Sequence, residues 1–599
     1  MFLTVEPLDS AVLTPICRGA TLARMVSLGG RPVRFRFGAY EADVERRELR
    51  KHGLRMHLRV KSFEVLAALL EHFGEIVTRD ELRRRLWPEG VFVDFENSLN
   101  SAVNRLRDVL GDSSAKPRFI ETLPRMGYRF IAKVEPLKTA FPRLAVLPFE
   151  NLNRDPEQDF FADGVADALT TALGNVSTLR VISRQSMLRF RGSRKTAPEI
   201  ARELKADAIV EGSVLQAGGR VRITAQLVQA APDQHLWAKS YECEVGDILT
   251  VQGQVARAIA EAVQVVLTPA EIGQLGRSRR VDPEAQVAYL KALQHMSWWS
   301  REGLQKGLEH LLLALEKDQT HALALAHLAE CYGLLGLWGH LPPAIAFSQA
   351  REAAMKALAL DDGLSVAHWS LGNAALFRDW DLVTCETEAR RAIELNPSDQ
   401  GAHVLNALLL AIRGDEARAA AEATLAVNLD PLSLYVNTSA AWVYLWVKEY
   451  GRAAEQARRT LDLFHESLQA YYVLGLVALR GSRYGEAIDA LEKAVKISPD
   501  PMSIAYLGAV QARAGRADLA RSTLQDLLLR SEREHVSPRC FVFLYAGLGE
   551  QDRALEWLER TYEGHDSGVL FLRVMPLFDP LRGTERFEKM VRRLGLKHQ

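Results

Sequence analysis

The chain has 599 residues, of which 48% are hydrophobic and 25% charged, and this composition excludes a largely disordered protein. At roughly 100–200 residues per domain, the length predicts about three to five domains. Lys plus Arg (75) equals Asp plus Glu (75), which excludes a protein whose whole surface attracts polyanions. Residues 31–135, however, carry 21 Lys/Arg against 16 Asp/Glu, and this local positive charge favours binding to a polyanion.

The five cysteines are odd in number, scattered, and never paired as CxxC, so they predict neither a disulfide framework nor a zinc site and indicate a reducing compartment. No run of about 18 uncharged apolar residues predicts a membrane span. At the N-terminus Glu6 and Asp9 interrupt the place where the apolar part of a signal peptide would lie. We therefore expect residues 1–30 to be a disordered leader and the protein to be cytoplasmic.

From Arg34 the pattern predicts short β-rich pieces, three helices and a β-hairpin. The expected helices are 61–73, 79–87 and 98–110. Thr78 and Glu81 have the spacing of a capping box at the start of the second helix, and Pro88 ends it because proline cannot donate a backbone hydrogen bond.

The third helix is expected to be amphipathic, because Leu99, Val103, Leu106 and Leu110 recur at helical spacing and should face the core. Small polar groups and arginine on the opposite face are what a helix needs to bond base edges in a major groove. The candidate DNA-binding residues on this helix are Asn97, Asn100, Ser101, Asn104, Arg105 and Arg107. Residues 119–131 predict two β-strands around a turn, which would place Arg125 near a hairpin tip, within reach of a minor groove or a phosphate.

The strings LWP, NRLRDVLGD and IETLPRMGYRF within residues 34–133 resemble the winged-helix domain of OmpR/PhoB-type bacterial transcription regulators. The resemblance implies that residues 98–110 form the recognition helix and 119–131 the wing. It also implies that Arg105 reads bases, that Arg107 holds a phosphate, and that Arg125 lies at the wing tip. Asn104 stands where a basic residue is common and Asp108 is acidic, so the family's sequence preference does not carry over. No receiver-type domain precedes the module, and phosphorelay control is not predicted.

Residues 142–268 predict a separate α+β domain. The expected strands are 144–149, 179–183, 208–216, 221–228 and 235–241, with helices over 160–173, 197–205 and 247–267. Within 221–228 apolar and polar residues alternate, which is the period of a half-buried strand. The pair Asp163-Gly164 favours a turn or cap over a ligand-binding loop.

The strings LAVLPFENL, VISRQSMLRF and ADAIVEGSVLQAGGRVRITAQLV in this region resemble the TolB-like module, whose role does not carry over. The overall layout resembles that of CadC-like regulators. In many such proteins a membrane helix follows the winged helix, but here residues 132–143 are short, charged and contain prolines, which predicts a linker.

The second half of the chain has an internal period of 34 residues. Pro397, Pro431, His465 and Pro499 lie on one register, and three further columns keep the same phase. Small residues fill two of these columns, Cys385/Ala419/Ala453/Ala487 and Ala392/Ala426/Thr460/Ala494, and apolar residues fill the third, Leu395/Leu429/Leu463/Ile497. Small residues let two antiparallel helices approach closely, and a proline at the junction is expected to open the next helix at its first turn.

This pattern resembles the tetratricopeptide repeat (TPR) family, and we expect seven or eight helical hairpins over 282–564 with residues 570–596 as a cap. Cys385 occupies a small-residue column, so packing is favoured over a reactive thiol. Trp369, Trp442, Tyr471 and Tyr472 are predicted to lie in the core or the groove.

The predicted fold is multidomain: an α+β winged helix-turn-helix at 31–135, an α+β middle domain at 142–268, and an all-α TPR solenoid at 282–599. The predicted function is a sequence-specific DNA-binding transcriptional regulator with double-stranded DNA as one partner. Its DNA binding is predicted to be controlled by a protein or peptide that binds the repeats, or by formation of a homodimer on DNA. The alternative is a soluble TPR scaffold whose winged helix binds protein. No catalytic residue, cofactor or metal ligand is predicted, since no such constellation appears.

Overall fold

The computed structural model describes residues 34–596 except 45–47, 52–53, 57, 87–94, 138–142, 156–157, 218, 231–233, 264, 266, 277–280, 298–299 and 338–339. The predicted leader and Pro88 lie outside the described residues. The chain divides into two compact units, Met1–Phe141 and Pro142–Gln599, each with its own core. None of the helices within the described ranges is long and apolar enough to cross a membrane.

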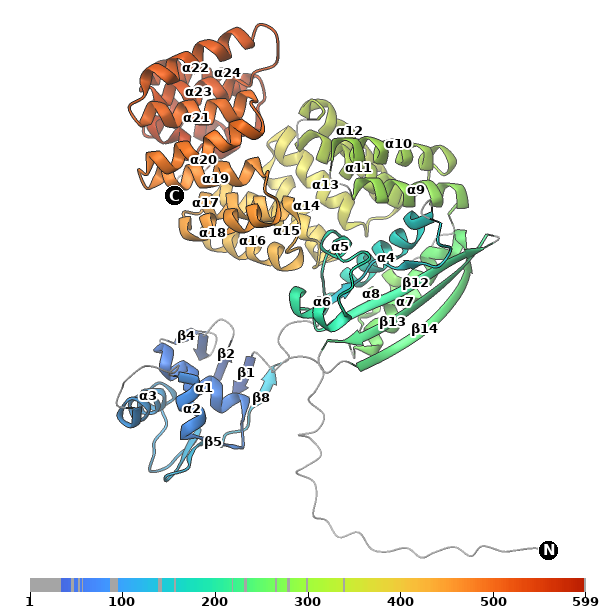
Figure 1. The fold of residues 1–599 in the computed structure, drawn as a ribbon, viewed down its shortest axis with the longest axis vertical. Helices are drawn as coiled ribbons and strands as arrows, with labels where there is room; N and C mark the ends of the chain where they lie inside the picture. The colour runs from blue at the N-terminus through green and yellow to red at the C-terminus, as the bar shows by residue number, and fades with distance from the viewer. Residues whose placement is uncertain are drawn as a thin grey trace, which may run out of the picture. The chain divides into compact units, whose positions relative to one another are not determined.

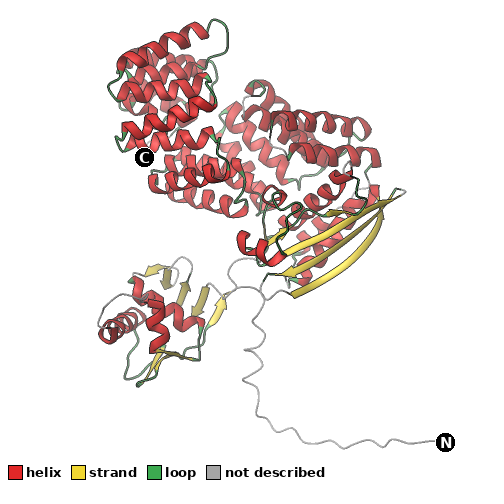
Figure 2. Ribbon diagram, viewed as in Figure 1, coloured by secondary structure: helices red, strands yellow, loops and turns green. Residues whose placement is uncertain are grey.

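Among its described residues, the first unit contains two antiparallel sheets and three helices, which Figures 1 and 2 show. One sheet has the strand order β4-β3-β2-β1-β8, from β1 (Arg34–Phe37), β2 (Tyr40–Asp43), β3 (Glu48–Lys51), β4 (Leu54–Met56) and β8 (Glu135–Leu137). The other has the order β5-β7-β6, from β5 (Ile76–Thr78), β6 (Ile120–Leu123) and β7 (Gly127–Phe130). The helices are α1 (Val60–Glu71), α2 (Arg79–Leu86) and α3 (Phe95–Leu110). The predicted winged-helix order of elements is confirmed.

The predicted amphipathic pattern of α3 accounts for the core of this unit. Leu99, Val103, Leu106 and Leu110 are all at most 2% exposed. The capping box at α2 is present, since the Thr78 backbone N–H donates to Glu81 (2.8 Å) and the Glu81 N–H donates back to the Thr78 hydroxyl (3.2 Å). Helix α3 begins at Phe95, three residues before the predicted start.

The second unit begins with a mixed sheet of strand order β11-β9-β12-β13-β14, with β10 beside β12. Its strands are β9 (Arg143–Val146), β10 (Glu150–Asn151), β11 (Arg180–Val181), β12 (Ala208–Ala217), β13 (Arg220–Gln229) and β14 (Gln234–Glu244). Strand β9 is parallel to β11 and β12 on its two sides, while β12, β13 and β14 run antiparallel. The predicted alternation of β13 is confirmed, because Val221, Ile223, Ala225 and Leu227 are at most 1% exposed.

In the part of residues 143–276 that the structure describes, five α-helices accompany this sheet: α4 (Asp159–Gly174), α5 (Arg184–Leu188), α6 (Ala197–Leu204), α7 (Ile248–Ala262) and α8 (Pro269–Leu275). The expectation that Asp163 belongs to a turn or cap was wrong, because it lies inside α4. The predicted helix over 247–267 extends too far, because α7 ends at Ala262. A capping box formed by Thr268 and Glu271 then starts a new helix at Pro269. Sequence reasoning also missed α5, which is only five residues long.

In the described part of residues 283–563, eight successive helical hairpins form the repeat array, confirming the predicted solenoid. Their helices are α9 (Pro283–Met296), α10 (Arg301–Lys317), α11 (Ala322–Leu337), α12 (Pro343–Leu360), α13 (Ser365–Ala374), α14 (Leu382–Leu395), α15 (Gln400–Arg413), α16 (Glu416–Leu429), α17 (Leu434–Trp446), α18 (Tyr450–Leu463), α19 (Leu468–Arg480), α20 (Tyr484–Ile497), α21 (Pro501–Arg513), α22 (Ala517–Arg530), α23 (Pro538–Gly547) and α24 (Gln551–Glu563). The small-residue columns pack as predicted, since all eight of their members are 0% exposed. Burial raises the pKa of the Cys385 thiol to about 12, which favours a packing role.

The role predicted for the junction prolines needs correction. Pro397 and Pro431 follow the end of one helix but do not open the next, because α15 and α17 begin three residues later. The side chains of Asp399 and Ser433 cap these helices by accepting backbone N–H bonds from Ala402 and Val436.

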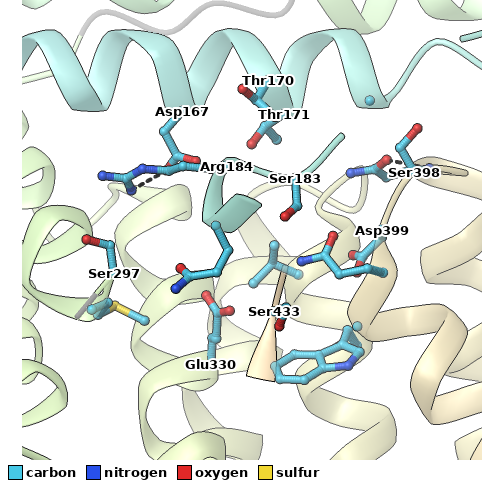
Figure 3. A pocket seen from close by; sticks show the side chains of 18 of the residues that line it. Asp167, Thr170, Thr171, Ser183, Arg184, Ser297, Glu330, Ser398, Asp399 and Ser433 are labelled. Carbon is cyan, nitrogen blue, oxygen red and sulfur yellow. Dashed lines mark hydrogen bonds and ion pairs between the residues drawn. The ribbon is translucent and has the colours of Figure 1, made fainter. Parts of the chain in front are cut away.

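The inner face of the first repeats is covered by the middle domain of the same chain. Figure 3 shows Asp167, Thr170 and Thr171 of α4 opposite residues of the array such as Glu330 and Ser433. The Ser186 hydroxyl donates to Asp430 (2.6 Å) and accepts the Leu432 backbone N–H (3.0 Å). Buried residues of the middle region and of the repeats therefore belong to one large hydrophobic cluster within one compact unit.

The C-terminal segment covers a further part of the array. It comprises η4 (Ser567–Phe571), η5 (Pro576–Leu581) and α25 (Glu585–Arg593). Phe571 stacks on Trp446 of α17 (4.5 Å between ring centroids), and Phe578 packs on Phe543 of α23 (5.1 Å). Of the aromatic residues predicted for core or groove, Trp369, Trp442 and Tyr472 are buried, and Tyr471 is partly exposed.

Candidate nucleic-acid interface

Helix α3 presents a polar face to solvent. Asn97, Asn100, Asn104 and Arg105 are exposed and Ser101 is partly exposed, while the apolar residues at helical spacing are buried on the other side. Carboxamide, hydroxyl and guanidinium groups present the donors and acceptors that base edges in a major groove pair with. The structure thus brings five of the six predicted helix residues to one accessible face.

Asn100 is fixed by a network that joins three elements of the unit. The Tyr128 hydroxyl of β7 donates to Asn100 Oδ1 (2.9 Å), and Arg79 Nη2 of α2 lies 3.5 Å from the same oxygen and 3.3 Å from the Tyr128 hydroxyl. The Arg79 guanidinium also lies over the Tyr128 ring (5.4 Å to the centroid). Asn100 is therefore held in orientation by groups that the sequence analysis did not identify.

The structure places Arg107 differently from the prediction. The residue is 6% exposed, and Nη2 donates to the Ile120 carbonyl (2.9 Å) and the Thr122 hydroxyl (2.7 Å) of β6. A guanidinium buried in this way cannot hold a phosphate without leaving its partners, which is costly. Arg107 therefore joins α3 to the wing, a position that differs from the predicted phosphate contact.

The wing is the β6–β7 hairpin, and Arg125 lies in its turn as predicted. Arg125 is exposed and has a positive φ of 62°, a left-handed conformation that occurs in tight turns. Gly127 follows and begins β7 opposite Thr78 of β5. A Cβ at this position would lie 2.1 Å from the Val77 carbonyl oxygen, so only glycine allows these strands to approach.

The loop that joins α3 to the wing is organised by Asp112. Its carboxylate accepts backbone N–H bonds from Arg118 (2.7 Å) and Ile120 (2.8 Å). Together with Arg107, Asp112 fixes the wing relative to α3, so the two surfaces that carry Arg105 and Arg125 are held as one structure. The sequence did not predict this role of Arg107 and Asp112, because the role depends on their contacts with the strand that follows.

Outside this unit, the described residues contain no cluster of three or more His, Cys, Asp or Glu side chains that could hold a metal ion. Cys331, Cys385 and Cys540 are buried free thiols, and burial raises the pKa of each to about 12. At neutral pH these thiols are protonated and poorly nucleophilic.

Comparisons with known proteins find family models that match two parts of the chain. The family "Transcriptional regulatory protein, C terminal" matches residues 53–130, and "Tetratricopeptide repeat" matches residues 468–501. The chain is 34% identical over 245 residues to "Putative adenylate cyclase 3" of Rhizobium meliloti (41% of this chain, 42% of that protein). It is 24% identical over 307 residues to "Transcriptional regulator HilA" of Salmonella typhimurium (50% of this chain, 54% of that protein).

Among solved structures, the chain is similar to the Klebsiella pneumoniae RstA DNA-binding domain in complex with the RstA box, with 32% identity, 16% of this chain and 96% of that chain covered, and a TM-score of 0.15. The chain spans about half the length, or less, of the curated relatives named above. The TolB-like resemblance of the middle region stays a prediction.

Proposed function

We propose that this chain, which contains an OmpR/PhoB-type winged-helix domain and C-terminal TPR repeats, is a sequence-specific DNA-binding transcriptional regulator. The observation that carries the proposal is the exposed polar face of α3, built in one rigid arrangement with the arginine-tipped wing. The family match and the relative named as a transcriptional regulator support it.

In this proposal α3 enters the major groove and the wing lies along the adjacent backbone or minor groove. Arg105 reads a base edge, because an exposed guanidinium at the centre of the face can bond both acceptors of a guanine. Asn97, Asn100, Ser101 and Asn104 supply further base or phosphate contacts, and Arg125 contacts the backbone from the wing tip. Arg107 acts indirectly, through the position of the wing.

Replacement of Arg105 by alanine is expected to cost about 1–3 kcal/mol of binding free energy at the specific site and much less on random duplex. Arg105→Lys is the matched control, since it keeps the charge but loses the planar pair of donors, and should lose specificity while keeping non-specific affinity. Fluorescence anisotropy with a duplex selected from a random pool, and with a scrambled duplex, measures both affinities. Equal losses on the two duplexes would refute base reading by Arg105.

The salt dependence of binding distinguishes this function from the alternative. A regulator that neutralises phosphates loses affinity steeply as salt rises, because counterions are released on binding. A TPR scaffold whose winged helix binds protein would show no duplex binding that responds in this way. We propose that the regulator acts in the cytoplasm and performs no catalysis of its own.

The second half of the proposal is that residues 142–599 control how many winged helices meet on DNA, through a protein partner or self-association. The inner face of the repeats is largely covered by α4, α5 and the C-terminal segment, so the contact surface is expected on the outer helices. Exposed apolar residues there are Ile345 and Met355 of α12, Val383 of α14 and Leu529 of α22.

The test compares the full chain with residues 1–141, which form a compact unit with their own core. A fragment ending near Thr268 is unsuitable because α4 packs on α9 of the array, where Gly164 lies against Leu290. On a duplex with two half-sites about 10 base pairs apart, the full chain is expected to bind more tightly and with greater cooperativity. If removal of residues 142–599 changes neither quantity, with and without cell extract, these residues do not control DNA binding.

A further inference from the structure

A groove lies along the first two helices of the array, α9 and α10. Its volume is about 570 Å³, within the range of small-molecule sites. The rest of its lining comes from the middle domain, at the turn from β12 to β13 and at the end of β14, where Val245 and Gly246 follow the strand. The groove therefore belongs to the second unit of the chain, apart from the winged helix.

The antiparallel packing of α9 and α10 gives this groove two different ends. At one end Lys317 Nζ lies 2.8 Å from the carboxylate of Glu284, so the two charges compensate each other. At the other end Lys291 of α9 lies near His310 of α10. Burial and then the charge of Lys291 lower the pKa of His310, although Glu309 opposes the shift, so this imidazole is neutral at neutral pH. The second end therefore combines an ammonium with a neutral imidazole.

Between these two ends the helices present apolar side chains. Val287 and Ala288 of α9 and Leu313 of α10 line this part, and Val245 of the middle domain adds to it. Leu313 is 42% exposed, although leucine is among the residues that proteins most often bury. An aliphatic chain that lies in the groove would remove this apolar surface from water, which is favourable.

Lys291 carries the one charge of the described lining that has no opposite charge beside it. Arg220 and Glu244 lie directly opposite each other in the β13–β14 ladder, where cross-strand neighbours of opposite charge attract. The Lys291 ammonium lies over the Phe160 ring of α4 (5.2 Å to the centroid), and it forms no ion pair with a carboxylate of the described residues. The uncompensated charge of the groove is therefore positive, and it favours an anionic ligand group.

We propose that this groove binds an aliphatic carboxylate, with Lys291 and His310 at the carboxylate and the chain over Val287 and Leu313. An ammonium and an imidazole N–H both donate to a carboxylate, and bonds of this kind to a charged group are among the strong ones. The site lies within residues 216–313 and goes beyond the function proposed above, since it takes no part in DNA binding and is tested without DNA.

The test is calorimetric titration of the full chain with octanoate, which carries both a carboxylate and an aliphatic chain. Acetate keeps the carboxylate without the chain, octylamine keeps the chain with a positive charge, and 1-octanol keeps the chain without a charge. Octanoate is expected to bind about tenfold more tightly than 1-octanol, while acetate and octylamine do not bind. Octanoate should also raise the temperature at which residues 142–599 unfold, since a ligand of the native state stabilises it.

Two substitutions locate the site. Lys291→Met keeps an unbranched side chain but removes its charge, so the Kd of octanoate should rise about tenfold while that of 1-octanol stays the same. Leu313→Asn places a polar group in the apolar part of the groove and should raise the Kd of both ligands. Lys356→Met is the matched control, because Lys356 is an exposed lysine of α12 that pairs with Glu352 and does not line the groove.

Three results would overturn the proposed site. The first is that octanoate does not bind to the native chain. The second is that acetate or octylamine binds as tightly as octanoate, since the groove would then not select a carboxylate on an aliphatic chain. The third is that Lys291→Met or Leu313→Asn has the same Kd for octanoate as Lys356→Met, since octanoate would then bind elsewhere on the chain.

Discussion

Replacement of Gly127 by alanine is expected to lower the free energy of unfolding of residues 1–141 by about 3 kcal/mol and to abolish DNA binding on every sequence. The new methyl group would lie 2.1 Å from the Val77 carbonyl oxygen and 2.9 Å from the Thr78 Cα. Both are backbone atoms of β5, so relief requires the strand pair to separate, and overpacking of this kind costs about 1–3 kcal/mol or more.

Separation of β5 from β7 would also affect α2, because Thr78 at the end of β5 caps this helix through its bonds with Glu81. Urea unfolding of residues 1–141 measures the stability change. Gly111→Ala is the control: Gly111 has a positive φ of 62° but no atom within 4 Å of the added Cβ, so only backbone strain of about 1 kcal/mol is expected. If both variants lose the same stability, the close approach at Gly127 is not what the wing requires.

The contribution of Asp430 to the free energy of unfolding of residues 142–599 is expected to fall as pH rises. This carboxyl is 1% exposed, and burial raises its pKa from 3.8 to about 6, although hydroxyls of Ser186, Ser183 and Ser433 oppose the shift. A folded pKa above the unfolded one gives stability that is fully present below pH 3.8 and is lost as pH rises through about 6. At about 1.4 kcal/mol for each pH unit, the loss is about 3 kcal/mol.

Asp430→Asn isolates this effect, because the amide has nearly the same shape and does not ionise. Histidines such as His321, whose pKa burial lowers to about 4, act in the opposite direction, so the native chain alone does not report on Asp430. The quantity to measure is the unfolding free energy of the native chain minus that of the variant, from about pH 4 to about pH 7. It should fall by about 3 kcal/mol, mostly between about pH 4 and about pH 6; a flat difference would contradict a raised pKa at Asp430.

The sequence predicted the parts of the fold that depend on local patterns. Helical spacing in α3 located its buried residues, and the 34-residue period located the packed columns, of which Ala419 and Ala453 are members. Both patterns arise because one element repeats its environment at a fixed interval.

Contacts between distant segments were beyond this reasoning. Arg107 was assigned to a phosphate because the resemblance to OmpR/PhoB-type regulators implied it, but its partner Thr122 lies in the following hairpin. Ser186 and Asp430 are 244 residues apart, and nothing in either stretch indicates that they meet. Part of the repeat surface on which a protein or peptide was predicted is thus covered by α4 and α5 of the preceding region.

The covering of the array has a mechanical consequence. A free TPR superhelix can change its curvature and twist, because each repeat contacts only its neighbours. Here Ser186 of the middle region bonds to Asp430 of the array. His565, far along the chain from Trp380, stacks on the Trp380 ring (4.0 Å between ring centroids). Contacts with segments outside the repeats at both places are expected to limit how far this solenoid can change its curvature.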